Sequence, residues 1–295
     1  MGYLFLSIAL LSGAVKGFCG KKMSVQADSM KSAILLNLIR MLLCIAFSLA
    51  VILLTGDIRY FIFDLSLLLI SVLSGVSTAC FVVCWLLVVR KSAYMMVDVF
   101  LMLGTLVPII SGYFIFSEPI TLIQCAGFIL LVIASLLMCS YNNKIKAKLS
   151  VSSLILLLAC GVANGVTGAS QRIFVNLSAD TPVSVFNLYT YVFSAITLAI
   201  ILALLSGKAR RTHEDNKARN ALSYILIMAA ALTSHSYFTT MAAIHLDSAH
   251  LYPLNQGASL ILSTIMATLF FKEKLTVKAV LGIVLSFVAL MIINM

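Results

Sequence analysis

The stretch Gly13–Gly20 (GAVKGFCG) returns about half a chain later as Gly161–Gly168 (GVANGVTG), with all three glycines at the same spacing. Similarity at a fixed distance is typical of a chain built from repeated structural units. Two more matches follow in the same order in both halves: Asn37–Arg40 (NLIR) with Asn187–Thr190 (NLYT), and Phe116–Thr121 (FSEPIT) with Phe271–Thr276 (FKEKLT). Three matches in register predict two similar halves, residues 1–148 and 149–295.

The composition places both halves in a lipid bilayer. Hydrophobic residues make up 62% of the 295 residues, charged residues make up 10%, and the mean hydropathy is +1.12. A soluble domain is about half apolar and about one quarter charged. Apolar runs near the roughly 20 residues that cross the hydrocarbon core recur along the chain, and they are too long and continuous for barrel strands. We therefore predict an all-α integral membrane protein with ten transmembrane helices, at 3–20, 33–54, 65–89, 93–116, 120–140, 151–170, 183–205, 221–242, 248–271 and 275–293.

The basic residues predict the orientation of these helices. The formal net charge of +10 could indicate a nucleic-acid partner, but nearly all lysines and arginines lie in short loops, where they fix orientation during membrane insertion. The gaps after odd-numbered helices are rich in them, whereas the other gaps hold only Arg59 and Arg172. By the positive-inside rule the rich gaps face the cytoplasm, so both termini are expected on the outer side of the cytoplasmic membrane.

The charges also predict that the second half is inverted relative to the first. Lys21 and Lys22 stand where the second half has only Arg172, so a gap that is basic in one half is poor in the other. An odd number of helices per half places the second half upside down in the membrane. Both observations favour two inverted five-helix repeats, 1–148 and 149–295.

In these features the whole chain resembles the drug/metabolite transporter superfamily, specifically its ten-helix EamA-like branch. The resemblance rests on the paired halves, on Arg40 early in the second helix, on Pro108 within the fourth, and on turns at Glu118 and Glu273, each followed by a threonine and a glycine-containing helix. It implies secondary transporters and exporters of amino acids, nucleobase-like metabolites or drugs, which work by alternating access. It also implies a central cavity lined by the first to fourth and sixth to ninth helices, with the fifth and tenth outside.

The second half departs from the family's pattern at the ninth helix. Ser263 occupies the place that matches Pro108, and Pro253 appears earlier, beside Tyr252. The bend in this helix is therefore expected nearer the external side.

Three ionisable residues, Lys16, Arg40 and Asp98, lie inside predicted helices. At about 1.5 Å per residue they sit roughly 7, 10 and 9 Å from the cytoplasmic ends of their helices. Charges at that depth favour a mutually compensating cluster or a water-filled cavity, although Lys16 and Arg40 could instead extend to the lipid headgroups. Asp98 is a candidate for coupling to a proton or cation, with a structural ion pair to Arg40 as the alternative. A spare positive charge would suit a substrate carboxylate.

The equivalent positions of the second half are uncharged, with Asn164 for Lys16 and Thr190 for Arg40. The external half of the cavity is therefore expected to be polar and neutral. Other side chains nearby offer hydrogen bonds or aromatic faces, with helix packing as their competing role. They are Asn187, Tyr189, Tyr191, His235, Tyr237, Tyr252, Asn255 and Gln256.

Several further positions are expected to serve structure. The repeated glycines should let helices approach closely. Glu118 and Glu273 should each cap the helix that follows it, because helix N-termini favour acceptors. Trp85 and Tyr94, near the cytoplasmic ends of their helices, suit interfacial anchoring as well as a cavity wall.

No catalytic or cofactor pattern stands in the sequence. The seven cysteines lie scattered in apolar segments without zinc or disulfide spacing, and no nucleophile elbow or phosphate loop is found. We therefore expect no enzyme activity, no cofactor, no metal and no nucleic-acid partner. The expected partners are a small-molecule substrate, the lipid bilayer and a coupling proton or cation, with the oligomeric state open.

The sequence favours a secondary transporter, coupled to protons or ions, that exports amino-acid-like metabolites. Within transport, the alternative is an exporter of cationic drugs, in which Asp98 and the tyrosines form a cation site. Outside transport, the alternatives are a membrane-embedded enzyme and a non-transporting scaffold. Matched inverted halves with charges at one depth favour transport over both.

Overall fold

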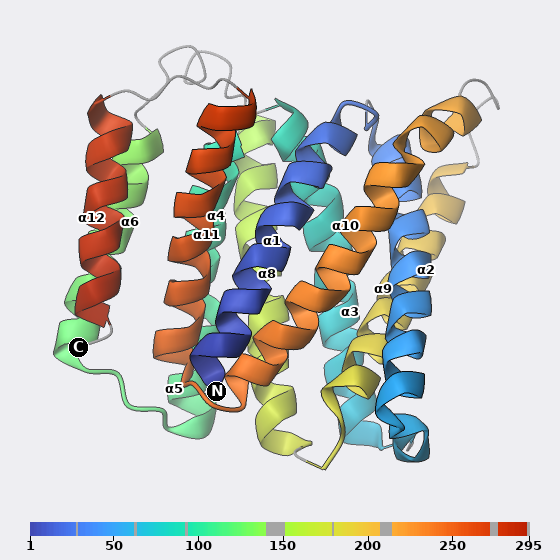
Figure 1. Cartoon of the computed structure of the whole chain (residues 1–295), viewed down its shortest axis with the longest axis horizontal. Coiled ribbons are helices and arrows are strands. Elements are labelled where there is room, and N and C mark those ends of the chain that lie inside the picture. Colours follow the sequence, from blue (N-terminus) through green and yellow to red (C-terminus); the bar gives the residue numbers. More distant parts are fainter. Residues whose placement is uncertain are drawn as a thin grey trace.

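A computed structural model of the chain is a bundle of long α-helices (Figure 1). It describes residues 1–295 except 28, 62–63, 92–93, 140–150, 179, 207–213, 272–276 and 294–295. The elements are α1 (Gly2–Ser24), α2 (Met30–Thr55), the 3-10 helix η1 (Asp57–Tyr60), α3 (Leu65–Lys91), α4 (Tyr94–Gly104), α5 (Leu106–Phe116), α6 (Leu122–Cys139), α8 (Val151–Leu177), α9 (Val183–Ser206), α10 (Glu214–Ala243), α11 (Ser248–Phe271) and α12 (Val277–Ile293).

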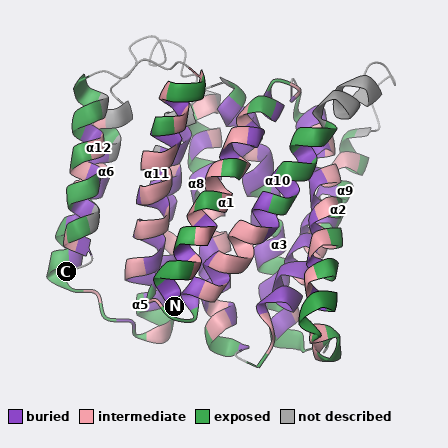
Figure 2. Ribbon diagram, viewed as in Figure 1, coloured by how far each residue is buried: buried purple, intermediate pink, exposed green. Residues whose placement is uncertain are grey.

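The length and polarity of these helices are those of a multi-pass membrane protein. In the described part of the chain, seven helices are long and apolar enough to cross a membrane, and three shorter apolar stretches lie within Phe100–Phe116, Leu122–Ala134 and Val280–Ile293. Large apolar side chains such as Leu54 and Leu122 are exposed on the outside of the bundle, while buried residues line the faces between helices (Figure 2). An apolar exterior of this kind suits lipid and not water.

The helix bounds follow the predicted spans closely, and the count of ten spans stays a prediction. The largest differences are at α8, which continues to Leu177 although the span was predicted to end at 170, and at α10, which begins at Glu214 although the span was predicted to begin at 221. Arg172 was expected in the following loop, and this expectation is wrong, because Arg172 lies within α8 and is 8% exposed. A window of mean hydropathy ends where charges begin, whereas backbone hydrogen bonding carries the helix further.

Local signals set the ends of α2. Its first turn carries a capping box, in which the Ser32 amide donates to Ser29 Oγ (3.1 Å) and the Ser29 amide donates to Ser32 Oγ (3.0 Å). The helix ends at Thr55 and is followed by Gly56 as its C-cap, whose φ of 76° lies in the left-handed region that glycine adopts without strain.

Packing brings helices of the two halves together throughout the bundle. The most extensive contacts join α1 with α10, α6 with α12, α3 with α8, and α9 with both α2 and α3. The α1, α3, α8 and α10 helices form the middle of the bundle, with α2 and α9 on one side and the α6–α12 pair at the opposite edge (Figure 1). The first residue of α1 and the last residue of α12 lie toward one end of the bundle, which we call the Arg172 end, and the opposite end is the Lys21 end.

The segment predicted as one helix at 93–116 is divided into α4 and α5 at Thr105. Pro108 has no amide hydrogen to donate, so the helical hydrogen bond to the Gly104 carbonyl is missing. Across this break α8 passes so closely that a Cβ added at Gly161 or Gly165 would overlap backbone carbonyl oxygens of α4. These glycines of the repeated motif therefore serve close helix packing.

Candidate functional site

A polar cavity with two adjoining lobes lies inside the bundle. The charged lobe, toward the Lys21 end, has an empty volume of about 750 Å³ including its open space, and the hydroxyl lobe, toward the Arg172 end, has about 690 Å³. The lobes share lining residues and therefore adjoin. The shared residues are Lys16, Phe81, Asn164, Leu232, His235, Asn255 and Gln256.

The charged lobe brings together the three ionisable residues that the sequence placed at one depth. Lys16 comes from α1, Arg40 from α2 and Asp98 from α4, and all three line the lobe. The described residues contain no ion pair among the three. Their formal charges leave one positive charge in excess.

Arg40 is almost completely buried, with 1% of its surface exposed. Its Nη1 donates to the sulfur of Met228 at 3.3 Å, while its Nε and Nη2 have no hydrogen-bond partner among the described residues. A guanidinium carries five donors in a planar fork that matches a carboxylate. Arg40 therefore offers unused donors beside the charged lobe.

Lys16 and Asp98 also have charged groups that could contact a substrate or an ion. The Lys16 ammonium lies 6.0 Å from the centroid of the Phe81 ring, and it also interacts electrostatically with Arg40 and Asp98. Asp98 is 6% exposed, and its Oδ2 has no hydrogen-bond partner among the described residues. Ser263 of α11, at the position that matches Pro108, lines the same lobe.

The hydroxyl lobe contains uncharged polar groups around the shared wall. Its own lining includes Thr78, Thr105, Thr167, Gln171, Thr190, Tyr191, Ser236, Thr239 and Tyr252. Two tyrosine hydroxyls there donate to backbone carbonyls, Tyr252 to Gly168 (2.6 Å) and Tyr191 to Leu232 (3.4 Å). Apart from Lys16 in the shared wall, the polar lining of this lobe is uncharged, and its assignment to the external half of the cavity stays a prediction.

Nine of the twelve residues proposed from the sequence line one or both lobes. His235 is among them, and its Nδ1 donates to the Ala9 carbonyl oxygen at 2.8 Å, which leaves Nε2 for other contacts. The other eight are Lys16, Arg40, Asp98, Asn164, Tyr191, Tyr252, Asn255 and Gln256.

The remaining three lie outside both lobes. Asn187 is buried and accepts a hydrogen bond from Ser236 Oγ at 3.0 Å, so it supports the wall from behind. Tyr189 packs edge-on against Phe61, with ring centroids 6.2 Å apart, and Tyr237 packs edge-on against its neighbour in α10. Both tyrosines belong to an apolar cluster near the Arg172 end.

Some lining residues were not proposed from the sequence. Thr167 and Gln171 lie one turn apart on α8. Thr167 falls inside the repeated glycine motif, so the comparison of the two halves could have identified it as a candidate. Trp85, proposed as an anchor or a wall, lines the charged lobe and is 6% exposed, which makes it a wall. The Tyr94 side chain lies outside the described residues.

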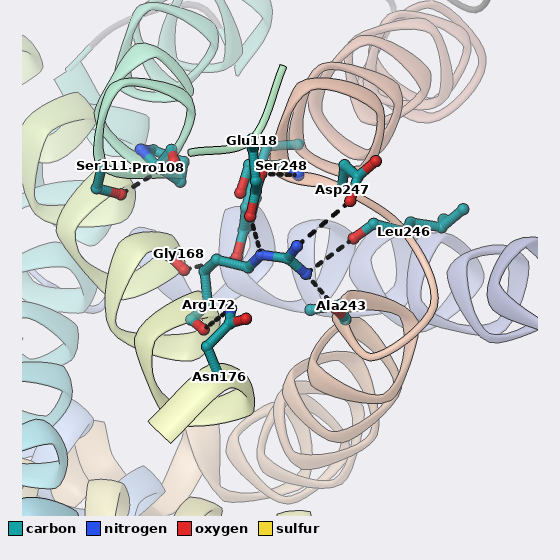
Figure 3. A network of polar contacts seen from close by, with 11 residues as sticks. Pro108, Ser111, Glu118, Gly168, Arg172, Asn176, Ala243, Leu246, Asp247 and Ser248 are labelled. Atoms are coloured by element: carbon teal, nitrogen blue, oxygen red, sulfur yellow. Dashed lines mark hydrogen bonds and ion pairs between the residues drawn. The ribbon is translucent and has the colours of Figure 1, made fainter. Parts of the chain in front are cut away.

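A second polar arrangement, which we call the Arg172 clasp, lies at the Arg172 end (Figure 3). Arg172 Nε forms an ion pair with Glu118 Oε1, and its Nη2 lies 3.4 Å from Asp247 Oδ1. Its Nη1 donates to the carbonyl oxygens of Ala243 (2.5 Å) and Leu246 (3.1 Å). The clasp is completed by the Ser248 amide, which donates to Glu118 Oε2 at 2.8 Å.

Glu118 was expected to cap the helix that follows it, and this expectation is wrong. Its carboxylate accepts from the first residue of α11 instead, while α6 is capped by Thr121, whose Oγ1 accepts from the Gln124 amide at 3.2 Å. The reason is the turn at Ser117, whose φ of 53° is left-handed and directs Glu118 back beneath α5. Glu273 lies outside the described residues.

A helical membrane bundle with a central polar cavity is an architecture found in small-molecule transporters. Residues 151–295 match the EamA-like transporter family, and the chain belongs to this family, within the drug/metabolite transporters. The whole chain is also similar to a protein of known crystal structure, with a TM-score of 0.68 over 98% of this chain and 97% of that one. Their sequences are 13% identical, so this similarity shows the fold alone. A search of curated proteins found no match.

Proposed function

We propose that the protein is a secondary active transporter that moves small polar metabolites, amino-acid-like compounds foremost, across the cytoplasmic membrane by alternating access. We further propose that it works as an exporter. The observation that carries the proposal is the charged lobe, where Lys16, Arg40 and Asp98 meet from three helices without pairing among themselves. Ionisable groups inside a membrane protein are rare, and they mark substrate and ion pathways.

The charges of the lobe fit an amino acid. A substrate carboxylate would accept from the unused Arg40 donors, with Lys16 adding a second positive charge, and a substrate ammonium would approach Asp98. The rest of the molecule would extend past Asn164 and Asn255 into the hydroxyl lobe, where neutral donors and acceptors are available. The adjoining lobes give such a substrate room on both sides of the charged groups.

Asp98 is the proposed coupling group. Its Oδ2 has no protein partner among the described residues, so a proton or a small cation could bind there without displacing a protein contact. Binding would neutralise the carboxylate that a substrate ammonium approaches, so the ion and the substrate would compete for Asp98, as the exchange of an inward-moving ion for an exported substrate requires. The coupling ion and the substrate would then affect each other's binding through the charge of Asp98.

The pattern of helix packing supports ten spans in two inverted repeats, 1–148 and 149–295. If α1 is equivalent to α8 and α3 to α10, then the α1–α10 and α3–α8 contacts are one contact made twice. The same holds for the α4–α8 and α1–α11 contacts, while α2 with α9 and α6 with α12 pair equivalent helices directly. Exchange between two such equivalent packings is how inverted-repeat transporters alternate access.

The distribution of charge supports an orientation with both termini outside. Lys21, Lys22 and Arg90 lie near the Lys21 end, which would face the cytoplasm. Arg172, near the opposite end, is paired with Glu118 and so contributes little unbalanced positive charge there.

The alternative of a cationic-drug exporter has less support. It required Asp98 together with the tyrosines, but Tyr189 and Tyr237 lie outside both lobes, and two cations stand beside the single carboxylate. The family match also gives a non-transporting scaffold or a membrane-embedded enzyme little support.

A thermal-shift screen followed by vesicle uptake tests the proposal. The purified protein is tested with amino acids, nucleosides and quaternary ammonium compounds, as wild type and as Lys16→Met, Asp98→Asn and the control Tyr189→Phe. We expect amino-acid-like ligands to raise the melting temperature of the wild type and of Tyr189→Phe, and both cavity variants to lose transport. Stabilisation by no ligand class, together with unchanged uptake in both cavity variants, would refute the assignment.

A further inference from the structure

We propose that the Arg172 clasp is the gate that closes the cavity at the Arg172 end, and that its ion pair must separate before substrate can pass there. This inference rests on the proposed transport function and assigns the gating of the same cavity. The clasp joins three parts of the chain: α8, the turn between α5 and α6, and the turn between α10 and α11 (Figure 3).

The position of the clasp relative to the hydroxyl lobe is the first argument. On each of four helices, a residue of the clasp, or Gly112 next to it, lies one helical turn, about 5.4 Å, beyond a residue that lines the lobe. The pairs, lining residue first, are Gly168 and Arg172 on α8, Thr239 and Ala243 on α10, Tyr252 and Ser248 on α11, and Pro108 and Gly112 on α5. The clasp therefore forms the next layer outward from the cavity.

The second argument concerns the partners of Arg172. Two of its contacts are backbone carbonyls, those of Ala243 and Leu246, which cannot rotate away as side chains do. Glu118 likewise holds a backbone amide, that of Ser248. Because both side chains contact backbone groups of the α10–α11 turn, a movement of α8 or of the turn at Glu118 relative to that turn would break these contacts together.

The third argument is the chemistry of the closure. A buried ion pair loses its hydration when the end is closed and regains it when the end opens to water, so the two states differ little in free energy. An apolar closure would instead expose apolar surface to water on opening. Gating needs two states of similar free energy, and the ion pair of Arg172 with Glu118 supplies them.

Close approach of the backbone at Gly112 is part of the closed arrangement. A Cβ added there would lie 2.7 Å from Glu118 Oε2 and 2.8 Å from Ser248 Oγ. Gly112→Ala should therefore displace the Glu118 carboxylate without changing any charge. It complements Glu118→Gln, which removes the charge but keeps an oxygen that can accept from the Ser248 amide.

Cysteine accessibility tests the gate in the full-length chain. In a background with the seven native cysteines replaced, Ser236→Cys reports on the hydroxyl lobe and Ser259→Cys on the charged lobe. A membrane-impermeant maleimide is applied separately to intact cells and to inside-out vesicles. Each reporter is combined with Glu118→Gln, with Gly112→Ala, or with the control Asp57→Asn, which perturbs the contact of Asp57 with Ser184 (2.6 Å), outside the clasp.

Both gate variants should raise the labelling rate of Ser236→Cys at least tenfold from the side that the Arg172 end faces. The labelling of Ser259→Cys from the opposite side should not rise, and Asp57→Asn should leave both rates unchanged. Unchanged labelling of Ser236→Cys, or an equal rise from both sides, would mean that the clasp only stabilises the fold and would overturn the proposal. Uptake measured on the same variants separates the two proposals, since transport at wild-type rate with unchanged labelling refutes the gate alone. Labelling as predicted without uptake of any tested compound refutes the transport function alone.

Discussion

Removal of either partner of the Arg172–Glu118 pair should strongly destabilise the protein, and removal of both should cost much less than the sum of the two single losses. Arg172→Met leaves the Glu118 carboxylate buried with the Ser248 amide as its remaining described partner. Glu118→Ala leaves Arg172 with the carbonyl oxygens of Ala243 and Leu246 and with the half-exposed Asp247 as its nearest described carboxylate. Loss of one partner of a buried ion pair costs about 3–5 kcal/mol, because the other charge stays buried and uncompensated.

The double variant should cost much less than the sum of the two. With both charges gone, the penalty reduces to backbone groups that lose a partner, the Ser248 amide and the Ala243 and Leu246 carbonyls. Each such group costs about 1–3 kcal/mol where water cannot reach it, and less at this end of the bundle. The expected coupling free energy is therefore about 3 kcal/mol or more.

The assay is reversible unfolding in mixed micelles by titration with sodium dodecyl sulfate, with helix content followed by circular dichroism. A matched cycle on Asp57 and Ser184, a polar contact at the same end, serves as the control. If the losses in the free energy of unfolding from Arg172→Met and Glu118→Ala add in the double variant, the two side chains do not stabilise the protein as a pair. The reasoning would then fail.

Three further outcomes follow from the structure. Gly165→Ala should lower stability by about 1–3 kcal/mol, because the added methyl would overlap the Gly104 carbonyl; Val162→Ala, at an exposed position of the same helix, is the control, and equal melting temperatures would contradict this packing. Arg40→Met should leave the ligand-free melting temperature unchanged or raise it, since Arg40 has two donors without described partners, and a large fall would reveal a partner that the site account lacks. Reporter fusions should place both termini outside the cytoplasm, and a cytoplasmic carboxyl terminus would overturn the charge-based orientation.

The fold was largely predictable because hydropathy alone sets the membrane spans. Errors arose where charge and helix formation conflict, as at Arg172, whose charge suggested a loop although α8 continues through it. The side chain is tolerated inside because the backbone carbonyls at the end of α10 and the Glu118 carboxylate surround it, and these partners lie more than 50 residues away in sequence. No local sequence pattern predicts partners that lie so far away in the sequence.

The sequence predicted the depth of the site residues in the membrane better than it predicted which of their side chains point into the cavity. Lys16, Arg40 and Asp98 were grouped by their distance from helix ends, and all three line one lobe. Tyr189 and Tyr191 illustrate the limit, since residues two apart on a helix differ by about 200° in direction, and one lines the cavity while the other packs in an apolar cluster. Which face of α9 points inward depends on packing with α2 and α3, which sequence periodicity does not reveal in a helix apolar on all sides.

The central claim is that the excess positive charge of the charged lobe binds a substrate carboxylate. The most direct measurement compares the binding of an amino acid identified in the screen with that of its carboxamide, in the wild type, in Arg40→Met and in the control Tyr237→Phe. We predict that the wild type and the control prefer the carboxylate at least tenfold, since a charge-assisted hydrogen bond contributes about 1.5–3 kcal/mol, and that Arg40→Met loses the preference. Equal binding of acid and amide by the wild type, or a preference that survives in Arg40→Met, would contradict the account.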